Sequence, residues 1–409
     1  MGALVFTAVL AATCPTEGVV RDAAALTTAL AGPARDVWVA GTIDGDFVAN
    51  RSVAVHGCDG ARLRGTGRGT VLTVKGDDVL IEDLALERSG HRVSAEDGAL
   101  KVTGERAVVR RITVNDTLYG IAFEACHGCV LEDVTIAGRT DVEENQRGDG
   151  IKLWEAHGST VRRAEVRGVR DVVVWYSRHV TLEDNRITGG RYGTHFMYAH
   201  DSTVRRSVLR GNTVGIFVMY SARVLAEDNE LSGARGPAGM GIGFKESDAV
   251  TLRRNQLVAN TTGVYLDYTP RDPAQPVLFE DNLIALNAVA LRTHSSERGA
   301  RFVTNDFLDN DALVEVDGNG DAMGIAFDQN HWAGYAGYDL DGDGEGDVAF
   351  QGKRLSSSLT DAHPELRWFH GTAAFGLYDA VARALPYFTS TLLFQDPRPV
   401  MRPHREVPR

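Results

Sequence analysis

The sequence has little of several features that mark common protein classes. It holds four cysteines, and acidic residues exceed basic ones, so that the formal net charge is −12 over 409 residues. A surface without a basic excess argues against sequence-independent nucleic-acid binding, which needs positive charge against the phosphates. After the first residues, no apolar run is long enough to span a bilayer. With 43% hydrophobic and 24% charged residues, the composition is that of a globular protein. From the net charge, we expect no nucleic-acid partner.

Catalytic signatures are also absent from the sequence. It contains no nucleophile elbow, no phosphate-binding loop and no HExxH motif. Potential catalytic side chains gather only at Lys245, Glu246, Asp248 and Asp267. These could line a carbohydrate-active cleft, or they could form ordinary surface salt bridges, which is the interpretation we prefer. The sequence therefore predicts no catalytic residues and a protein that is not an enzyme.

The region from Gly150 to Tyr268 repeats one unit, without helices between its strand-like segments. The equivalent positions are Gly150, Asp171, Gly193, Gly215, Gly241 and Gly263, which are separated by 21, 22, 22, 26 and 22 residues. A period in the low twenties predicts stacked solenoid turns, and strands without intervening helices cannot form βαβ units. We therefore predict an all-β fold, a right-handed parallel β-helix, the hand following the usual connection of parallel strands.

Asparagines recur at fixed places within the repeat. Asn185, Asn229 and Asn255 each lie 14 residues after the start of their copy, and Asn212 and Asn260 lie 19 residues after. Asparagine tolerates left-handed backbone at corners, and stacked asparagine side chains can bond into a ladder. The pattern predicts such a ladder in the β-helix.

Four regions are expected along the chain. Residues 1–12 are apolar and end in small residues, as in a signal peptide cut near Ala12; a buried first strand, or a start codon assigned too far downstream, is the alternative. Residues 13–330 form the β-helix, with a helix-like stretch at 21–41 that caps its open end. Residues 331–370 form an acidic segment and a connector.

The last region, 371–409, is amphipathic. Apolar residues recur there at roughly helical spacing at Phe375, Tyr378, Ala382, Leu385 and Leu392. Pro386 should kink or end that helix. The helix could cap the last turn, or it could dock on a membrane partner through Phe375, Tyr378 and Leu385.

Alternate residues of each repeat should face opposite sides of the strand. Inward positions are Ile151/Leu153, Val172/Val174, Thr194/Phe196, Ile216/Val218, Ile242/Phe244 and Val264/Leu266. The outward positions include Trp154, Trp175, His195, Met197, Phe217 and Met219, which we name the outer stripe. Because turns stack about 4.8 Å apart, we expect a continuous exposed apolar surface that binds a partner through Trp154, Trp175 and Phe217. The alternative is that a loop or the C-terminal helix covers the stripe.

The middle of the outer stripe carries soft ligands rather than carboxylates. Thioether and imidazole groups suit Cu(I), and they come together in His195, Met197 and Met219. His200 and Met240 lie in nearby corners and could contribute. The sequence therefore predicts a copper site there, with Cu(I) bound transiently.

A calcium site is predicted at the acidic segment. Asp339, Asp341, Asp343 and Asp347 match positions 1, 3, 5 and 9 of an EF-hand-type loop. Position 12 is Phe350 instead of the bidentate glutamate, so one ligand is missing. The alternative is an acidic turn without a metal.

The cysteines allow several interpretations. Cys14 and Cys58 could form a disulfide that pins the first turn. Cys126-x-x-Cys129 is by itself a weak metal or redox signal, and two small apolar residues in turn positions are the alternative.

The motifs GTHFMYAHD and GMGIGFKESD, followed by GYDLDGDGEGDV and LPYF, resemble the NosD family of periplasmic maturation proteins of nitrous oxide reductase. The resemblance runs from about residue 90 to residue 396. It implies a right-handed parallel β-helix in the periplasm, and a non-catalytic subunit that works with an ABC ATPase and its membrane permease. Such a subunit helps to load copper into apo nitrous oxide reductase, receiving it from a membrane-anchored copper chaperone. The C-terminal region would dock on the permease and so associate the protein with the membrane.

A second class of function stays open, because the same repeat occurs in polysaccharide lyases and epimerases, and fold does not fix function.

Overall fold

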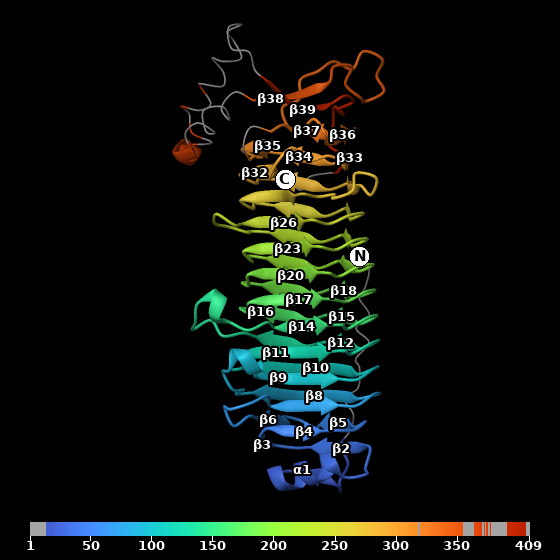
Figure 1. The fold of residues 1–409 in the computed structure, drawn as a ribbon, viewed down its shortest axis with the longest axis vertical. Coiled ribbons are helices and arrows are strands. Elements are labelled where there is room, and N and C mark those ends of the chain that lie inside the picture. The colour runs from blue at the N-terminus through green and yellow to red at the C-terminus, as the bar shows by residue number, and fades with distance from the viewer. Residues whose placement is uncertain are drawn as a thin grey trace, which may run out of the picture. The chain divides into compact units, whose positions relative to one another are not determined.

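The computed structural model describes residues 14–317, 320–354, 364–369 and 391–405, together with Thr372, Ala374 and Leu377. The chain divides into two compact units, unit 1 up to Val169 and unit 2 from Arg170 onwards. Each unit is a parallel β-helix built from short strands (Figure 1). The predicted fold class is thereby confirmed. No helix among the described residues is long and apolar enough to cross a membrane.

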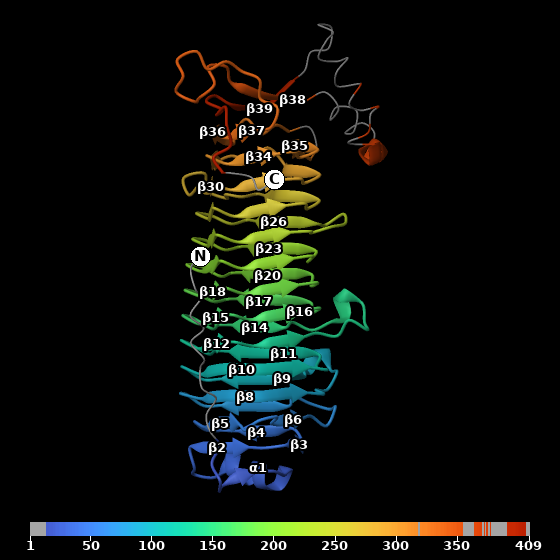
Figure 2. The ribbon, with the colours of Figure 1, turned by 180° about the vertical axis from the view of Figure 1, so that it is seen from behind.

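Unit 1 stacks its strands in two sheets. One sheet contains β4 (Phe47–Ala49), β7 (Leu72–Lys75), β9 (Gly98–Thr103), β11 (Tyr119–Glu124) and β14 (Ile151–Trp154). The other contains β1 (Val19–Val20), β2 (Asp36–Val39), β3 (Thr42–Asp44), β5 (Ala54–Gly57), β6 (Arg62–Arg64), β8 (Leu80–Glu87), β10 (Val108–Asn115), β12 (Val130–Glu132), β13 (Thr135–Ala137), β15 (Thr160–Arg162) and β16 (Glu165–Arg167). The loop that carries the short helix η2 (Glu144–Gln146) projects from this stack in both views (Figures 1 and 2).

A helix closes the first end of unit 1, as predicted, but it is shorter than the predicted stretch. Helix α1 (Ala23–Ala31) begins where the Asp22 side chain accepts a hydrogen bond from the backbone N–H of Ala25 at 2.9 Å. It buries Leu26 and Leu30 against the first strands. The helix stops before Gly32-Pro33, which cannot continue it, so the rest of the predicted stretch forms β2.

Unit 2 uses three strands per turn, in three parallel rows. The first row contains β17 (Asp171–Trp175), β20 (Tyr192–Met197), β23 (Val214–Met219), β26 (Met240–Lys245), β29 (Thr262–Asp267), β32 (Val289–Thr293) and β35 (Ala312–Val316). The second contains β18 (Thr181–Glu183), β21 (Thr203–Arg205), β24 (Leu225–Glu227), β27 (Thr251–Arg253), β30 (Val277–Glu280), β33 (Ala300–Val303) and β36 (Ala326–Asp328). The third contains β19 (Arg186–Thr188), β22 (Val208–Arg210), β25 (Glu230–Ser232), β28 (Gln256–Val258), β31 (Leu283–Ala285), β34 (Asp306–Leu308) and β37 (His331–Trp332).

The inward columns form the core, as the alternation predicts. All twelve predicted inward side chains are buried in the structure. Towards the end of unit 2 the core becomes aromatic, with the Phe279 and Phe302 rings stacked 4.1 Å apart and those of Phe307 and Trp332 at 4.2 Å. Since each turn contacts its neighbours, this burial adds up turn by turn.

The predicted asparagine ladder is present. Asn229, Asn255, Asn282 and Asn305 are buried, and each amide oxygen accepts a backbone N–H from the turn before. From Asn255 on, the same oxygen also accepts the side-chain N–H of the preceding asparagine. The predicted reason was partly wrong. The left-handed residue at each corner is the one before the asparagine, such as Asp228 at φ 56°, because the asparagine side chain must point inward to reach its neighbours.

The last described residues return to the end of unit 2. Strand β39 (Thr391–Asp396) pairs antiparallel with β38 (Phe350–Arg354). The buried Asp396 carboxylate accepts hydrogen bonds from Asn330 and from the Trp332 indole, and so ends the asparagine ladder. Leu392, which helical spacing had included in a helix, therefore lies in a strand.

Candidate functional site

In unit 2 the outer stripe lies on three neighbouring strands, β17, β20 and β23, and β26 carries the next register partners of its residues. Two columns cross them. The successive register partners of the first column are Val173, His195, Phe217 and Gly243. Those of the second column are Trp175, Met197, Met219 and Lys245. The parallel register thus brings side chains that are about 22 residues apart in sequence into one cluster.

His195 is the most enclosed polar group of the stripe. Its side chain faces Met219, with Nε2 and the thioether sulfur 3.2 Å apart, and the Trp175 indole N–H donates to Nδ1 at 3.4 Å. Burial lowers the pKa of the imidazole to about 4. The ring is therefore neutral at physiological pH, which is the form that binds a metal.

The expectation that the whole stripe is exposed was wrong for His195, which is only 5% exposed. The Tyr192 ring lies 4.8 Å from the imidazole and 5.5 Å from the Phe217 ring. Tyr192 is itself fixed, because the Arg191 guanidinium lies over its ring at 4.5 Å and pairs with the buried Asp171 carboxylate. Aromatic neighbours of the same turns thus enclose the imidazole, while Trp175, Met197, Phe217 and Met219 stay half-buried.

Met240 borders this cluster. A Cβ added to Gly243 would come within 2.5 Å of the Phe217 ring and 3.1 Å of the Met240 sulfur, so both side chains lie across the glycine backbone. Glycine is needed here because any side chain would occupy the space of the Phe217 ring. Gly243 has no side chain on the outer face, and the Phe217 and Met240 side chains occupy the space above its backbone.

His200 has a separate place. It lies in the corner after β20, bridged to Arg178 and Ala222 of the adjoining turns. Its Nδ1 accepts the backbone N–H of Ala222 at 3.1 Å, and burial lowers its pKa. The structure thus brings together His195 and Met219, with Met197 as the register partner of Met219. His200 instead binds the backbone of the next turn at the corner.

Tyrosines next to the stripe were missed by the sequence analysis. The Tyr176, Tyr198 and Tyr220 rings stack on one another at 5.2 and 5.0 Å, and each residue has a left-handed backbone. Tyr176 and Tyr198 are exposed. The repeated dipeptides Trp-Tyr, Met-Tyr and Met-Tyr could have shown this column, because each tyrosine directly follows a stripe residue.

Three of the four charged residues at the far end of the stripe, Lys245, Asp248 and Asp267, form ion pairs. Lys245 Nζ lies 3.2 Å from the Asp267 carboxylate. Asp248 is buried, pairs with Arg271 at 2.9 Å and accepts the backbone N–H of Asp272. This arrangement fits the salt-bridge interpretation of these residues.

Trp154 belongs to unit 1, where the outer face is charged. Lys152 lies over its ring at 5.2 Å, is only 8% exposed, and binds the Glu96 and Glu124 carboxylates at 2.6 and 3.3 Å. The predicted partner role of Trp154 stays a prediction.

The acidic segment forms a compact loop. Carboxylate oxygens of Asp339, Asp341 and Asp343 lie within 4.8 Å of one another. The Asp347 carboxylate instead accepts the backbone N–H of Leu340 at 2.7 Å, and Asp339 accepts those of Gly342 and Gly344. Calcium binding by this loop stays a prediction.

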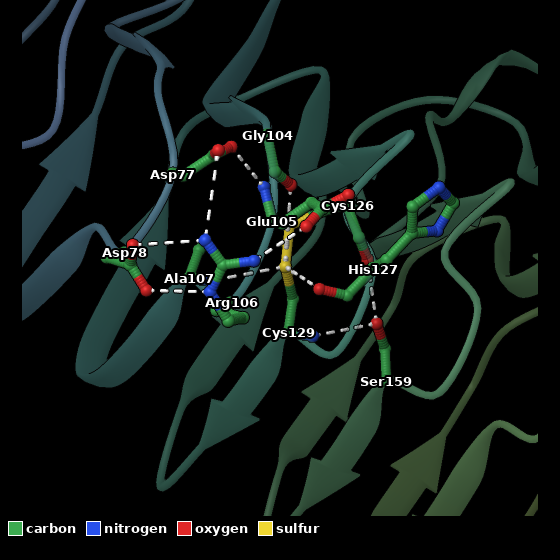
Figure 3. The surroundings of a disulfide bond; sticks show 10 residues. All are labelled: Asp77, Asp78, Gly104, Glu105, Arg106, Ala107, Cys126, His127, Cys129 and Ser159. Carbon is green, nitrogen blue, oxygen red and sulfur yellow. Dashed lines mark hydrogen bonds and ion pairs between the residues drawn. A yellow bond between two sulfur atoms is a disulfide. The ribbon is translucent and has the colours of Figure 1, made fainter.

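Both cysteine pairs form disulfides, Cys14 with Cys58 and Cys126 with Cys129. Figure 3 shows the second pair, in which Ser159 Oγ accepts the Cys129 N–H and donates to the Cys126 carbonyl. Both sulfurs of this pair are buried, and because they are bonded to each other they are not thiolate ligands. The disulfide therefore links two positions three residues apart within one turn of the β-helix.

The docking residues predicted near the C-terminus, Phe375, Tyr378 and Leu385, lie outside the described residues, as does the predicted signal segment 1–12.

A family model described as periplasmic copper-binding protein (NosD) matches residues 132–337, just over half of the chain. The chain belongs to the NosD family. The matched residues include the outer stripe from Trp154 onwards and the asparagine ladder. They also include residues 331–337, at the start of the predicted acidic segment. The resemblance found in the sequence motifs is thus confirmed.

Relatives of this NosD-family chain are named as transporter-associated proteins. The "Probable ABC transporter binding protein NosD" of Pseudomonas aeruginosa is 27% identical, over 92% of this chain and 90% of the relative. The protein of the same name from Stutzerimonas stutzeri is 25% identical, over 89% of this chain and 86% of the relative. Among solved structures, the periplasmic alginate epimerase AlgG is 13% identical, with a TM-score of 0.46, over 76% of this chain and 84% of the epimerase.

Proposed function

We propose that this chain is a non-catalytic periplasmic subunit that handles Cu(I) for the maturation of nitrous oxide reductase, together with an ABC ATPase and its membrane permease. The contact between His195 Nε2 and Met219 Sδ, at 3.2 Å on the outer face of unit 2, carries the proposal. A neutral imidazole beside a thioether is a donor set that suits Cu(I) better than hard cations.

Three features of the site support copper as cargo. Met197 is the register partner of Met219, so a second thioether lies on the neighbouring strand. The imidazole is neutral, so no proton has to leave an imidazolium before copper binds. His195 is enclosed, but the half-buried Trp175, Met197 and Met219 side chains keep part of the cluster at the surface, where a partner protein that delivers or takes up copper can reach it.

The surroundings of the site fit the roles that the relatives' names and the family description suggest. The aromatic and thioether surface, continued by the Tyr176–Tyr198–Tyr220 stack, is rich in the residue types that interfaces favour. A membrane-anchored copper chaperone that delivers copper, and apo nitrous oxide reductase that receives it, would approach this face. Residues 371–409 would connect the subunit to the permease.

The test is an anaerobic titration of the full chain with Cu(I) against a chromophoric competing chelator. The variant His195→Gln/Met197→Leu/Met219→Leu should bind Cu(I) at least about tenfold more weakly. Met323→Leu is the matched control, because Met323 is exposed and lies in a loop away from the stripe. Equal affinity of the wild type and the triple variant would refute the site.

A cellular experiment tests the role in maturation. In cells that make nitrous oxide reductase, replacement of the chain by the triple variant should yield reductase with a lowered copper content, while Met323→Leu leaves the copper content unchanged. Copper-replete reductase from cells that carry the triple variant would contradict the function proposed for these residues.

A further inference from the structure

The hydrogen bond from Trp175 fixes the proton of His195. The indole N–H of Trp175 points at Nδ1 over 3.4 Å, and the two rings are perpendicular, with an interplanar angle of 89°. An indole nitrogen can only donate. Nδ1 is therefore the acceptor nitrogen of the neutral imidazole, and the single ring proton lies on Nε2, which faces the Met219 sulfur.

This arrangement is the reverse of the usual one around a metal-binding histidine. Such a histidine normally donates its second N–H to a carboxylate, a carbonyl or a water, which leaves the other nitrogen with a lone pair towards the metal. Here the outer partner is a donor, so the nitrogen beside the thioether carries the hydrogen instead of a free lone pair.

We propose that Trp175 holds His195 in the tautomer that cannot bind copper through Nε2, and thereby keeps the affinity of the site for Cu(I) low. The inference rests on the proposed function of the His195–Met219 pair. When copper binds Nε2, the proton moves from Nε2 to Nδ1, the copper–nitrogen bond forms, and the hydrogen bonds to Trp175 and Met219 break. No proton is released, and the indole N–H must turn away because it would otherwise face a second N–H.

The neighbours of His195 make this device effective. Tyr192 at 4.8 Å and Phe217 at 6.1 Å flank the imidazole, and the Asp171–Arg191 pair keeps Tyr192 in place. The ring therefore has little room to flip about its Cβ–Cγ bond, a rotation that would put Cδ2 in the place of Nδ1 and Cε1 in the place of Nε2. A site that gives up the hydrogen bond from Trp175 for each copper ion bound releases its cargo more readily than one arranged in the usual way.

The test uses Trp175→Phe, which keeps an aromatic ring but removes the N–H. Cu(I) affinity of the full chain, measured under anaerobic conditions with a competing chelator, should rise about three- to tenfold, since one hydrogen bond no longer opposes binding. Trp38→Phe is the matched control, because Trp38 also contacts a histidine, His56 at 4.4 Å, but lies on β2 of unit 1. Its Cu(I) affinity should equal that of the wild type.

A second measurement follows the tautomer without copper. The ¹⁵N shifts of the His195 imidazole, identified by comparison with His195→Gln, should report the Nε2–H form in the wild type and a mixture in Trp175→Phe. A gain in affinity is not the effect expected from a purely structural role of the tryptophan.

The outcomes separate the two proposals. Binding by the wild type with no gain in Trp175→Phe, or an unchanged tautomer in that variant, overturns the role of Trp175 alone. Absence of Cu(I) binding in both proteins overturns the proposed function and this inference with it.

Discussion

Removal of one asparagine from the middle of the ladder should destabilise unit 2 strongly. In Asn305, the amide oxygen accepts two hydrogen bonds from Asn282, and the amide nitrogen donates to the Phe279 carbonyl and to Asn330, all between 2.9 and 3.0 Å. Asn305→Ala leaves at least the Asn282 N–H and the Phe279 carbonyl without these partners in a fully buried place. At about 1–3 kcal/mol for each buried unsatisfied group, the expected loss is about 3–5 kcal/mol.

Two further variants grade this effect. Asn310→Ala breaks a similar pair of bonds to Asn287, but Asn310 is only half-buried, so water can replace them and the loss should be about 1–2 kcal/mol. Asn305→Ser should lie between the two, since Ser207 occupies the equivalent place in an earlier turn and accepts the Asn185 N–H. Its hydroxyl can keep the acceptor role but reaches fewer partners.

The assay is urea unfolding of the full chain, followed by far-UV circular dichroism, with the slope of the transition compared among variants. If the slopes agree, the midpoints give the changes in unfolding free energy. A loss in Asn305→Ala no larger than that in Asn310→Ala would refute the reasoning, because burial would then not decide the cost of a broken ladder.

The remaining predictions concern the site and the acidic loop. Burial lowers the folded-state pKa of His195 to about 4. The contribution of this residue to stability, about 3 kcal/mol, is therefore fully present above pH 6.5 and is lost as the pH falls from 6.5 to 4. The difference in urea midpoint between wild type and His195→Gln should shrink over that range, and a pH-independent difference would contradict this prediction. Gly243→Ala should displace the Phe217 ring and cost about 1–3 kcal/mol in the same assay, whereas Gly342→Ala, where an added Cβ meets nothing, tests the cost of left-handed backbone alone. If the acidic loop binds calcium, EDTA should lower the melting temperature of the wild type and leave that of Asp341→Asn unchanged; an unaltered wild type would contradict the prediction.

The sequence by itself determined the repeat, the inward columns and the ladder. Each turn of a β-helix packs on its neighbours, so the information for the fold repeats about every 22 residues and can be read without knowing distant contacts. The soft side chains of the stripe were visible for the same reason, since alternation along a strand assigns each residue to one face. The family motifs lie on these same strands.

Only the tertiary structure decided how the site is assembled. Burial of His195 depends on the Tyr192 ring, and the Tyr192 ring depends on the Asp171–Arg191 pair across a turn, which no periodicity reveals. The contact of His195 with both Trp175 and Met219 likewise requires the side-chain directions of three strands at once. At the end of unit 2, Asp396 closes the ladder on Asn330 over 66 residues of sequence. Local pattern fixes which face a residue occupies, but its partners on that face follow from packing between turns.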